Sequence, residues 1–337
     1  MDFETRIAEY LMHRNPDGGS VTIDQFARIH GGSSQQTYRL RATWNKDGAH
    51  REQRLILRQP PEAGMVEADN DLEYLVYSAL NGVAIPVPVP HYMEQDAKWL
   101  ERPFFIMDMM PGKPGHFYVP GDPYEGQGLK VAEAFWRHLG DLAKLDHRLP
   151  GLDRLRGAAE TALHWRDELD FWEATLDAAE AGVEPVVRGA IRWLRANPPP
   201  APAKPAICHG DYRSGNFLFL DDGSISAILD WEMCHVSDPL EDVAWAINSM
   251  WTMERHLPLA EGLAFWEEAS GLKVDPLALD WWRLFTAVKC CGLWTNAEAS
   301  FEDGINREMS IALTAVRATH FHHMEILDRM EKLGAMA

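Results

Sequence analysis

The chain changes character near Pro111-Gly112, and this change constrains the fold more than any other feature of the sequence. Before it, short apolar runs with a period of two predict strands at residues 26–30, 37–44, 54–58 and 104–109. A turn at 45–48, Asn-Lys-Asp-Gly, joins two of them as a hairpin. Apolar residues at helical spacing predict helices at 2–14 and 66–80. We therefore expect residues 1–109 to form a small, mostly antiparallel sheet with one inserted helix.

After the Pro-Gly pair the apolar period becomes helical. Helices are expected at 131–147, 164–179, 185–196, 240–251, 259–269, 276–297 and 307–333. Two apolar runs, 217–220 and 225–229, flank Asp221-Asp222-Gly223 and predict a hairpin. The length of 337 residues also favours two cores over one. We expect an α+β protein with a small, strand-rich first part, 1–109, and a larger, mainly helical part, 110–337.

Composition narrows the class of partner. A formal net charge of −19 argues against nucleic acid, whose phosphates require an excess of Lys and Arg. The same charge suits a cationic substrate or simply a solvated acidic surface. No apolar run is long enough to cross a bilayer, and the four cysteines form no disulfide framework. The sequence predicts a cytoplasmic protein without a membrane or nucleic-acid partner, and its oligomeric state stays open.

Two short polar segments between apolar runs carry the chemistry. The first, at 209–216, reads His-Gly-Asp-Tyr-Arg-Ser-Gly-Asn, and the second, at 229–232, reads Leu-Asp-Trp-Glu. They supply Asp211 to orient or accept a hydroxyl proton, and Asn216 and Asp230 as hard oxygen ligands for Mg²⁺. Arg213 can neutralise charge on a transferring phosphoryl group. This pattern predicts magnesium-dependent phosphoryl transfer.

Segments of the first part add candidate nucleotide contacts. The turn between two predicted strands contains Gly31, Gly32, Ser33 and Ser34, whose backbone N–H groups could approach phosphate oxygens, although an ordinary hairpin has the same composition. Strand alternation puts Ile56 and Arg58 on one face, either lining a nucleotide cleft or facing solvent. Glu73, on the following helix, is a candidate ion-pair partner of Arg58.

The strand at 104–109 leaves through Pro111-Gly112 and offers Met107, Asp108 and Met109 to a flat base. Its backbone N–H and C=O groups would hydrogen-bond the base while the methionines pack around it. A methionine-rich strand is also typical of an ordinary core. Its position between the two parts of the chain favours the interpretation as a hinge.

With these segments in place, the chain resembles the aminoglycoside phosphotransferase and choline kinase superfamily, which has a protein-kinase-like, two-lobed fold. The resemblance implies that 209–216 is the catalytic loop with Asp211 as base, and that 229–232 is the metal-binding segment. It further implies a phosphate loop at 31–37, a hinge at 104–110, and acids in 237–244 that brace the catalytic loop. ATP and Mg²⁺ follow as donor and cofactor, with a small-molecule hydroxyl as acceptor.

One position departs from the superfamily pattern. The third strand carries Arg58 where lysine is common, and Pro60-Pro61 follow it. Arginine keeps the charge and adds a bidentate fork, but the two side chains are not interchangeable. Arginine followed by two prolines is similar to the branch containing the kinase-like domain of acyl-CoA dehydrogenase-associated proteins.

Two other classes of function compete with a kinase. One is a non-catalytic nucleotide-binding module that serves a partner interaction. The other is a metal-binding protein that uses His320, His322 and His323 together with His209 or His235. If the chain is a kinase, the helical segments 163–176 and 279–296 would build the acceptor pocket. Their tryptophans, Trp165, Trp172, Trp281, Trp282 and Trp294, would serve as pocket walls or as core. The acceptor itself cannot be read from the sequence.

Overall fold

The computed structural model describes residues 2–29, 35–60, 70–116, 121–159, 163–179, 184–202, 204–304 and 309–335. These residues form two compact units. The first comprises Met1–Gly112 together with Ser226–Glu232, and the second comprises Lys113–Ile225 together with Met233–Ala337. A short segment late in the chain therefore belongs to the first unit.

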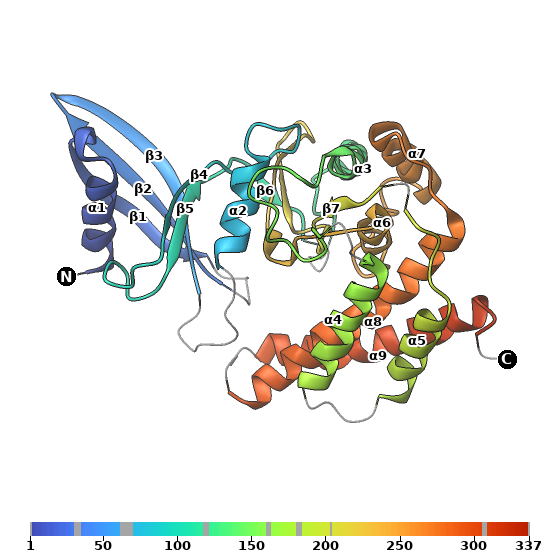
Figure 1. Cartoon of the computed structure of the whole chain (residues 1–337). Coiled ribbons are helices and arrows are strands. Elements are labelled where there is room, and N and C mark those ends of the chain that lie inside the picture. The colour runs from blue at the N-terminus through green and yellow to red at the C-terminus, as the bar shows by residue number, and fades with distance from the viewer. Residues whose placement is uncertain are drawn as a thin grey trace. The chain divides into compact units, whose positions relative to one another are not determined.

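The first unit contains a five-stranded antiparallel sheet (Figure 1). Its strands follow the spatial order β1-β2-β3-β5-β4, and their bounds are β1 Ser20–Ile29, β2 Gln36–Lys46, β3 Ala49–Gln59, β4 Pro90–Glu94 and β5 Phe104–Asp108. β2 and β3 meet at a tight turn in which Asp47 and Gly48 both have positive φ. β3 lies in the middle of the sheet, so Leu55 to Gln59 are all buried.

The helix α1 (Phe3–Arg14) covers one face of this sheet. Asp2 caps its first turn, because its carboxylate accepts from the Thr5 N–H at 2.8 Å. The helix buries Ile7, Tyr10 and Leu11 against apolar residues of the strands, including Leu40, Ala42, Trp44, Leu55, Leu57, Phe104 and Ile106. A 3₁₀ turn, η1 (Pro16–Gly18), connects α1 to β1. The opposite face of β3 is left to carry Ile56 and Arg58.

Two further segments complete the first unit. The helix α2 (Asn70–Leu80) follows β3, and Val76, Tyr77 and Leu80 on it are buried. The late segment contains most of β9 (Ile225–Ile228) and leads into the 3₁₀ turn η2 (Trp231–Met233). It is tied to the unit where the Ile228 N–H donates to the Pro86 carbonyl at 2.8 Å.

The second unit is mainly helical. Its helices are α3 Gly128–Lys144, α4 His164–Ala178, α5 Pro185–Ala196, α6 Pro239–Ala246, α7 Leu259–Ser270, α8 Pro276–Glu302 and α9 Met309–Lys332. Short strands, β6 Lys113–Pro114, β7 Ala206–Cys208, β8 Phe217–Phe219 and β10 His235–Ser237, pair as β6 with β8 and β7 with β10. Among the residues described, no helix is both long and apolar enough to span a membrane.

The helix α8 is the centre of the second unit, in contact with α4, α5, α6 and α9. Nearly all of its residues from Ala278 to Gly292 are buried, whichever side of the helix they occupy, as expected of a helix enclosed by others. Trp172, Trp281 and Trp282 are core residues of this region, while Trp165 and Trp294 are half-buried.

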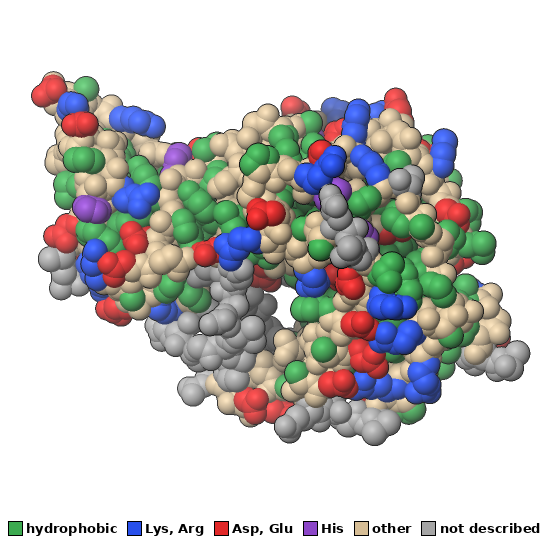
Figure 2. All heavy atoms as spheres, in the orientation of Figure 1, with side chains coloured by type: hydrophobic (Ala, Val, Ile, Leu, Met, Phe, Trp, Pro, Cys, Tyr) green, Lys and Arg blue, Asp and Glu red, His purple; other side chains and the backbone are tan. Residues whose placement is uncertain are grey.

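The surface of the second unit mixes charges of both signs. In Figure 2, basic and acidic side chains lie together over α4 and α5. There Arg195 and Arg188 each pair with Glu173, at 2.5 and 3.5 Å, and Asp170 and Asp177 flank them. Ion pairs thus offset much of the acidic charge on this face.

The expected α+β fold, with an antiparallel N-terminal sheet and a helical remainder, is confirmed. The helix expected at 240–251 is too long, because it ends at Ala246. Beyond it the Asn248 side chain accepts from the Met250 N–H at 3.0 Å, a local bond that competes with helix continuation. The first strand begins at Ser20 instead of residue 26, since a bulge at Gln25 interrupts its alternation.

Several other predicted bounds also shift. The helix expected at 131–147 runs from Gly128 to Lys144, and the one expected at 276–297 continues to Glu302. The strands β4, β6, β7 and β10 were not predicted, and each has five residues or fewer. A strand of this length contains too few alternating positions to show a period of two.

Candidate active site

The first unit holds one group of candidate site residues, centred on Arg58. Its Nη1 donates to Glu73 Oε1 at 2.6 Å, so the ion pair expected between β3 and α2 is present. The side chains of Arg58 and Glu73 are 10% and 1% exposed, so solvent has little access to the ion pair. Burial raises the pKa of Glu73 to about 7, while Arg58 acts in the opposite direction. Arg58 thus favours an ionised Glu73 at neutral pH.

Arg58 belongs to a closed ring of four residues. Its Nη2 donates to Asp230 Oδ1 at 3.1 Å, and the Asp230 N–H donates to the Tyr77 hydroxyl oxygen at 3.2 Å. The Tyr77 hydroxyl in turn donates to Glu73 Oε1 at 3.1 Å, which closes the ring. Asp230 is held at both its carboxylate and its backbone by groups of β3 and α2.

Asp230 has a left-handed backbone, with φ +69°. This conformation is uncommon for residues other than glycine, although aspartate tolerates it better than most. Nearby bonds have to compensate for its energetic cost. The Tyr77 contact to the Asp230 N–H is one such bond, so the ring also fixes the direction of this carboxylate.

The sheet face next to this ring carries the predicted base-binding residues. Ile56 on β3 pairs directly with Met107 on β5, which places both on one face of the sheet. A cavity of about 450 Å³ opens on the first unit, and Met109 is among the residues that line it, with Gln25, Phe26, Ala27, Arg39, Leu40, Arg41 and Arg54. Aliphatic side chains on such a face can pack against a flat ring.

The predicted hinge has fewer available backbone donors than the sequence suggests. The Asp108 N–H donates to the Val89 carbonyl at 2.9 Å, and the Met109 N–H donates to the Arg54 carbonyl at 3.0 Å. The Asp108 carboxylate is engaged as well, with His91 Nε2 2.7 Å away. Among Met107, Asp108 and Met109, a base would therefore meet carbonyl oxygens and methionine side chains before free N–H groups.

The second unit holds Asp211, whose carboxylate accepts three N–H donors. Trp245 Nε1 and Arg213 Nε donate to Oδ1 at 2.9 and 2.8 Å, and Asn216 Nδ2 donates to Oδ2 at 2.6 Å. The Asp211 side chain is 15% exposed. Three donors from different directions fix the rotamer of the carboxylate, as a proton acceptor in a reaction requires.

Asn216 is oriented by the same contacts. Its Nδ2 donates to both the carbonyl and the carboxylate of Asp211, at 3.0 and 2.6 Å. Because the amide nitrogen is committed to Asp211, the amide oxygen is the atom presented to another partner. An oxygen is the ligand that Mg²⁺ prefers, so this geometry fits the metal role predicted for Asn216.

The Asp242 carboxylate holds the backbone of the loop that carries Asp211. The Asp242 carboxylate accepts from the backbone N–H groups of His209 and Gly210, at 2.6 and 2.9 Å. Gly210 has φ +82°, and a Cβ there would lie 2.3 Å from the Met233 carbonyl oxygen. Only glycine allows this turn, which brings the chain into position directly before Asp211.

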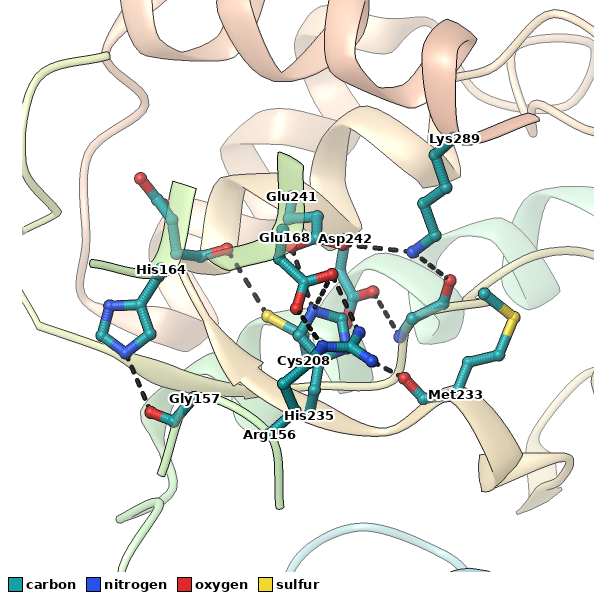
Figure 3. A network of polar contacts seen from close by, with 12 residues as sticks. Arg156, Gly157, His164, Glu168, Cys208, Met233, His235, Glu241, Asp242 and Lys289 are labelled. Atoms are coloured by element: carbon teal, nitrogen blue, oxygen red, sulfur yellow. Dashed lines mark hydrogen bonds and ion pairs between the residues drawn. The ribbon is translucent and has the colours of Figure 1, made fainter. Parts of the chain in front are cut away.

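A buried polar network lies behind this loop (Figure 3). Cys208, His235 and Glu241 form the one group in the described residues with the spacing of metal ligands. His235 Nε2 lies 3.0 Å from Glu241 Oε2, and the Lys289 ammonium lies 3.1 Å from Glu241 Oε1. The Lys289 ammonium therefore already supplies a positive charge to this group. In the described part of the chain, His320, His322 and His323 are not part of such a group, whereas His235 is.

The structure brings the predicted residues together in two sets, one in each unit. Ile56, Arg58, Glu73 and Asp230 share the first, and Asp211, Arg213 and Asn216 share the second. Gly31, Gly32, Ser33 and Ser34 lie outside the described residues. Tyr77, Trp245 and Lys289 were missed by sequence reasoning. Lys289 left one signal, since it is a lysine within an otherwise apolar helical stretch.

Comparison with known proteins decides the family. A family model described as the phosphotransferase enzyme family matches residues 25–282. The chain belongs to this family. Among curated proteins it is similar to acyl-CoA dehydrogenase family member 11 of Gallus gallus, with 28% identity over 234 residues. That alignment covers 68% of this chain and 28% of the relative, so the chain spans well under half of the relative's length.

Solved structures support the same fold. A Ralstonia eutropha protein, provisionally assigned as an aminoglycoside phosphotransferase, superposes with a TM-score of 0.74 over 97% of this chain and 98% of its own, at 18% identity. A thermostable mutant of aminoglycoside phosphotransferase APH(4)-Ia, in a ternary complex with AMP-PNP and hygromycin B, gives a TM-score of 0.57 at 17% identity. It is covered over 98% of its length and covers 95% of this chain. Identities this low establish the fold alone.

Proposed function

We propose that this member of the family is an ATP- and Mg²⁺-dependent kinase that phosphorylates a hydroxyl group of a small molecule. The observation that carries the proposal is the Asp211 carboxylate, held by Trp245, Arg213 and Asn216 in a single orientation. A carboxylate fixed in this way can orient an acceptor hydroxyl and take its proton. The solved relative with bound AMP-PNP supports ATP as the donor.

In this mechanism Arg213 serves two groups. Its Nε holds Asp211 and its Nη1 donates to the Ser214 carbonyl at 3.1 Å, while its positive charge can neutralise charge that develops on the transferring phosphoryl group. Asn216 and Asp230 would hold Mg²⁺, which when bound neutralises nucleotide phosphate charge. Arg58, kept in place by Glu73, would contact phosphate oxygens, and Ile56 and Met107 would pack against the base.

Acceptor-free ATP hydrolysis tests the proposal most directly, because the acceptor is unknown. Phosphoryl-transfer sites of this kind transfer slowly to water when no acceptor is bound. We expect Mg²⁺-dependent ADP release from ATP that the Asp211→Asn variant lacks, although that variant still binds Mg·ATP. Equal ADP release by the parent and by Asp211→Asn would refute the role of Asp211.

The alternative, a non-catalytic nucleotide-binding module, predicts a different result. It would bind Mg·ATP without any ADP release above the Asp211→Asn background. If hydrolysis is detected, a screen of hydroxyl-bearing metabolites and aminoglycosides, with Asp211→Asn as the blank, identifies the acceptor by an accelerated ADP release. Running the screen with GTP as well as ATP determines the donor.

A further inference from the structure

Lys289 is a buried cation within the central helix of the second unit. It is 1% exposed, and its neighbours on α8 are buried too. An ammonium group out of water is costly unless hydrogen bonds and an opposite charge compensate for it. The contacts of the Lys289 ammonium therefore identify the groups that this charge stabilises.

The ammonium reaches the catalytic loop directly. Lys289 Nζ donates to the Gly210 carbonyl at 2.8 Å and to Glu241 Oε1 at 3.1 Å. Gly210 is the residue immediately before Asp211, and Asp242 accepts from its N–H group at 2.9 Å. Both sides of the Gly210 backbone are thus held by buried charged groups.

A second route runs through Trp245. Lys289 Nζ lies 4.8 Å from the centroid of the Trp245 ring, over its face, in a cation–π contact. The same indole donates from Nε1 to Asp211 Oδ1 at 2.9 Å. One ammonium therefore touches both the backbone that leads into Asp211 and the ring that binds the Asp211 carboxylate.

We propose that Lys289 is a positioning residue for Asp211, acting through the Gly210 carbonyl and the Trp245 indole. This proposal rests on the proposed kinase function, because it names what orients the base of that reaction. A misplacement of about 1 Å at a reacting group can cost about 10²-fold in rate. Lys289 touches neither nucleotide nor acceptor in this scheme, so nucleotide affinity does not depend on it.

The surrounding network keeps Lys289 charged. Figure 3 shows its side chain pointing from α8 into the cluster around Glu241 and Asp242. Burial alone lowers the pKa of Lys289, but Glu241, Glu168 and Asp242 raise it by more, so the pKa lies above its ordinary value. Glu241 is also bonded to His235, at 3.0 Å, and is fixed from a second side.

The indole contact is tested by Trp245→Phe, which keeps the ring face but removes the N–H donor. Trp266→Phe is the matched control, because the Trp266 Nε1 is buried and has no hydrogen-bond partner among the described residues. We expect Trp245→Phe to lower the rate of Mg²⁺-dependent ATP hydrolysis by about tenfold or more, with Mg·ATP affinity within about twofold of the parent. Equal rates in the two variants would overturn this route.

The ammonium is tested by Lys289→Met, which keeps much of the side-chain volume and removes the charge. Thr286→Val, one turn earlier on α8, is the control, since its hydroxyl is buried without a partner in the described part of the chain. We expect Lys289→Met to lose about 10²-fold in hydrolysis rate with little change in Mg·ATP affinity. Because an unpaired Glu241 could unfold this variant, the double variant Lys289→Met/Glu241→Gln is measured beside it. A double variant that hydrolyses ATP as fast as the parent would overturn the proposal.

Two readouts separate positioning from general stability. The effects of Lys289→Met and Trp245→Phe on the rate should be less than additive, since both act through Asp211. The indole ¹H–¹⁵N signal of Trp245, assigned by its absence in Trp245→Phe, should move in Lys289→Met and stay in place in Thr286→Val. Additive rates together with an unmoved signal would contradict the proposal.

The indole signal also distinguishes the two levels of inference. If the parent shows no Mg²⁺-dependent hydrolysis above the Asp211→Asn blank, the proposed function fails. Even then, the Trp245 signal should move both in Asp211→Asn and in Lys289→Met, because the contacts themselves do not require turnover. A signal that moves in Asp211→Asn but not in Lys289→Met would refute the link from Lys289 to Asp211.

Discussion

Arg58 Nη2 lies 3.1 Å from Asp230 Oδ1, although 172 positions separate the two residues in the chain. The same guanidinium holds Glu73 through Nη1 at 2.6 Å. The planar fork of arginine presents separate Nη1 and Nη2 donors to the two carboxylates in a fixed geometry, which a lysine ammonium on its flexible stem does not. The arginine that departs from the common lysine therefore has a structural partner in Asp230.

Removing Arg58 should destabilise the first unit. Arg58→Met leaves Glu73 buried without a counter-charge, and we expect a loss of about 3 to 5 kcal/mol in the free energy of unfolding at about pH 8. Arg58 lowers the pKa of Glu73, which is about 7 in the parent, so in the variant this pKa lies higher. Protonation of Glu73 in the variant should therefore reduce the loss as the pH falls toward about 7, and below about 7 the loss should no longer change with pH. Urea denaturation at several pH values measures it. Arg41→Met is the control, since its pair with Asp24 is exposed, and its smaller loss should be insensitive to pH in this range.

The Tyr77 hydroxyl should contribute to both stability and nucleotide binding. Tyr77→Phe removes the partner of the Asp230 N–H and of Glu73, which we expect to cost about 1 to 3 kcal/mol in the free energy of unfolding. With its backbone less constrained, Asp230 should bind Mg·ATP more weakly. Tyr10→Phe is the matched control, because the Tyr10 hydroxyl is buried without a partner among the described residues. Identical losses in the two variants would show that the hydroxyl contacts of Tyr77 are of no consequence.

Magnesium dependence should disappear when the Asp230 charge is removed. Asp230→Asn is a better test than alanine, because asparagine tolerates the left-handed backbone that Asp230 adopts. In the parent, chelation of Mg²⁺ should weaken ATP binding by about tenfold or more, whereas in Asp230→Asn chelation should have little effect. Calorimetric titration with and without a chelator gives the two affinities. A parent protein that binds ATP equally well in both conditions would contradict the metal site.

His235 should make part of the stability dependent on pH. Burial lowers its pKa, but Glu168 and Glu241 raise it by more, and the pKa lies above the ordinary value of 6.5. A raised pKa means that the folded state binds the proton more tightly. The stability that protonated His235 contributes is therefore fully present below pH 6.5 and is lost as the pH rises through the folded-state pKa of His235.

The measurement compares the parent with His235→Gln in urea from about pH 6 to pH 9, where one proton corresponds to about 1.4 kcal/mol per pH unit. The charged groups that face His235 are Glu168 on α4, Glu241 on α6 and, less directly, Arg156, and all of them remain in the variant. We expect the difference in stability between the two proteins to shrink with rising pH. A difference that stays constant would show that His235 does not bind a proton in this range.

The sequence was sufficient for the fold class and for the members of the candidate site that stand in local motifs. Asp211, Arg213 and Asn216 lie within one short segment, so their spacing alone indicated that they would lie together. The Arg58–Glu73 pair was also expected, because a strand followed by a helix brings these positions within reach.

The contacts that were missed are those between distant segments. Trp245 lies 34 positions from Asp211, and Lys289 lies 79 positions from Gly210. No periodicity links such residues, since their proximity depends on how α6 and α8 pack around the catalytic loop. The bounds of α6 were wrong for a related reason, because the Asn248 side chain forms a local turn that hydrophobic spacing does not reveal.

The assignment of Ser226–Glu232 to the first unit has a consequence for how the protein can be made. During synthesis Arg58, Glu73 and Tyr77 emerge from the ribosome long before Asp230 is added. The first unit therefore lacks its last segment while most of the early helices of the second unit are being synthesised. For the same reason, a fragment cut after Gly112 would carry three members of the ring and lack the fourth. Expressing residues 1–112 alone would leave the ring without Asp230, whereas supplying residues 226–232 as a peptide offers a way to complete it.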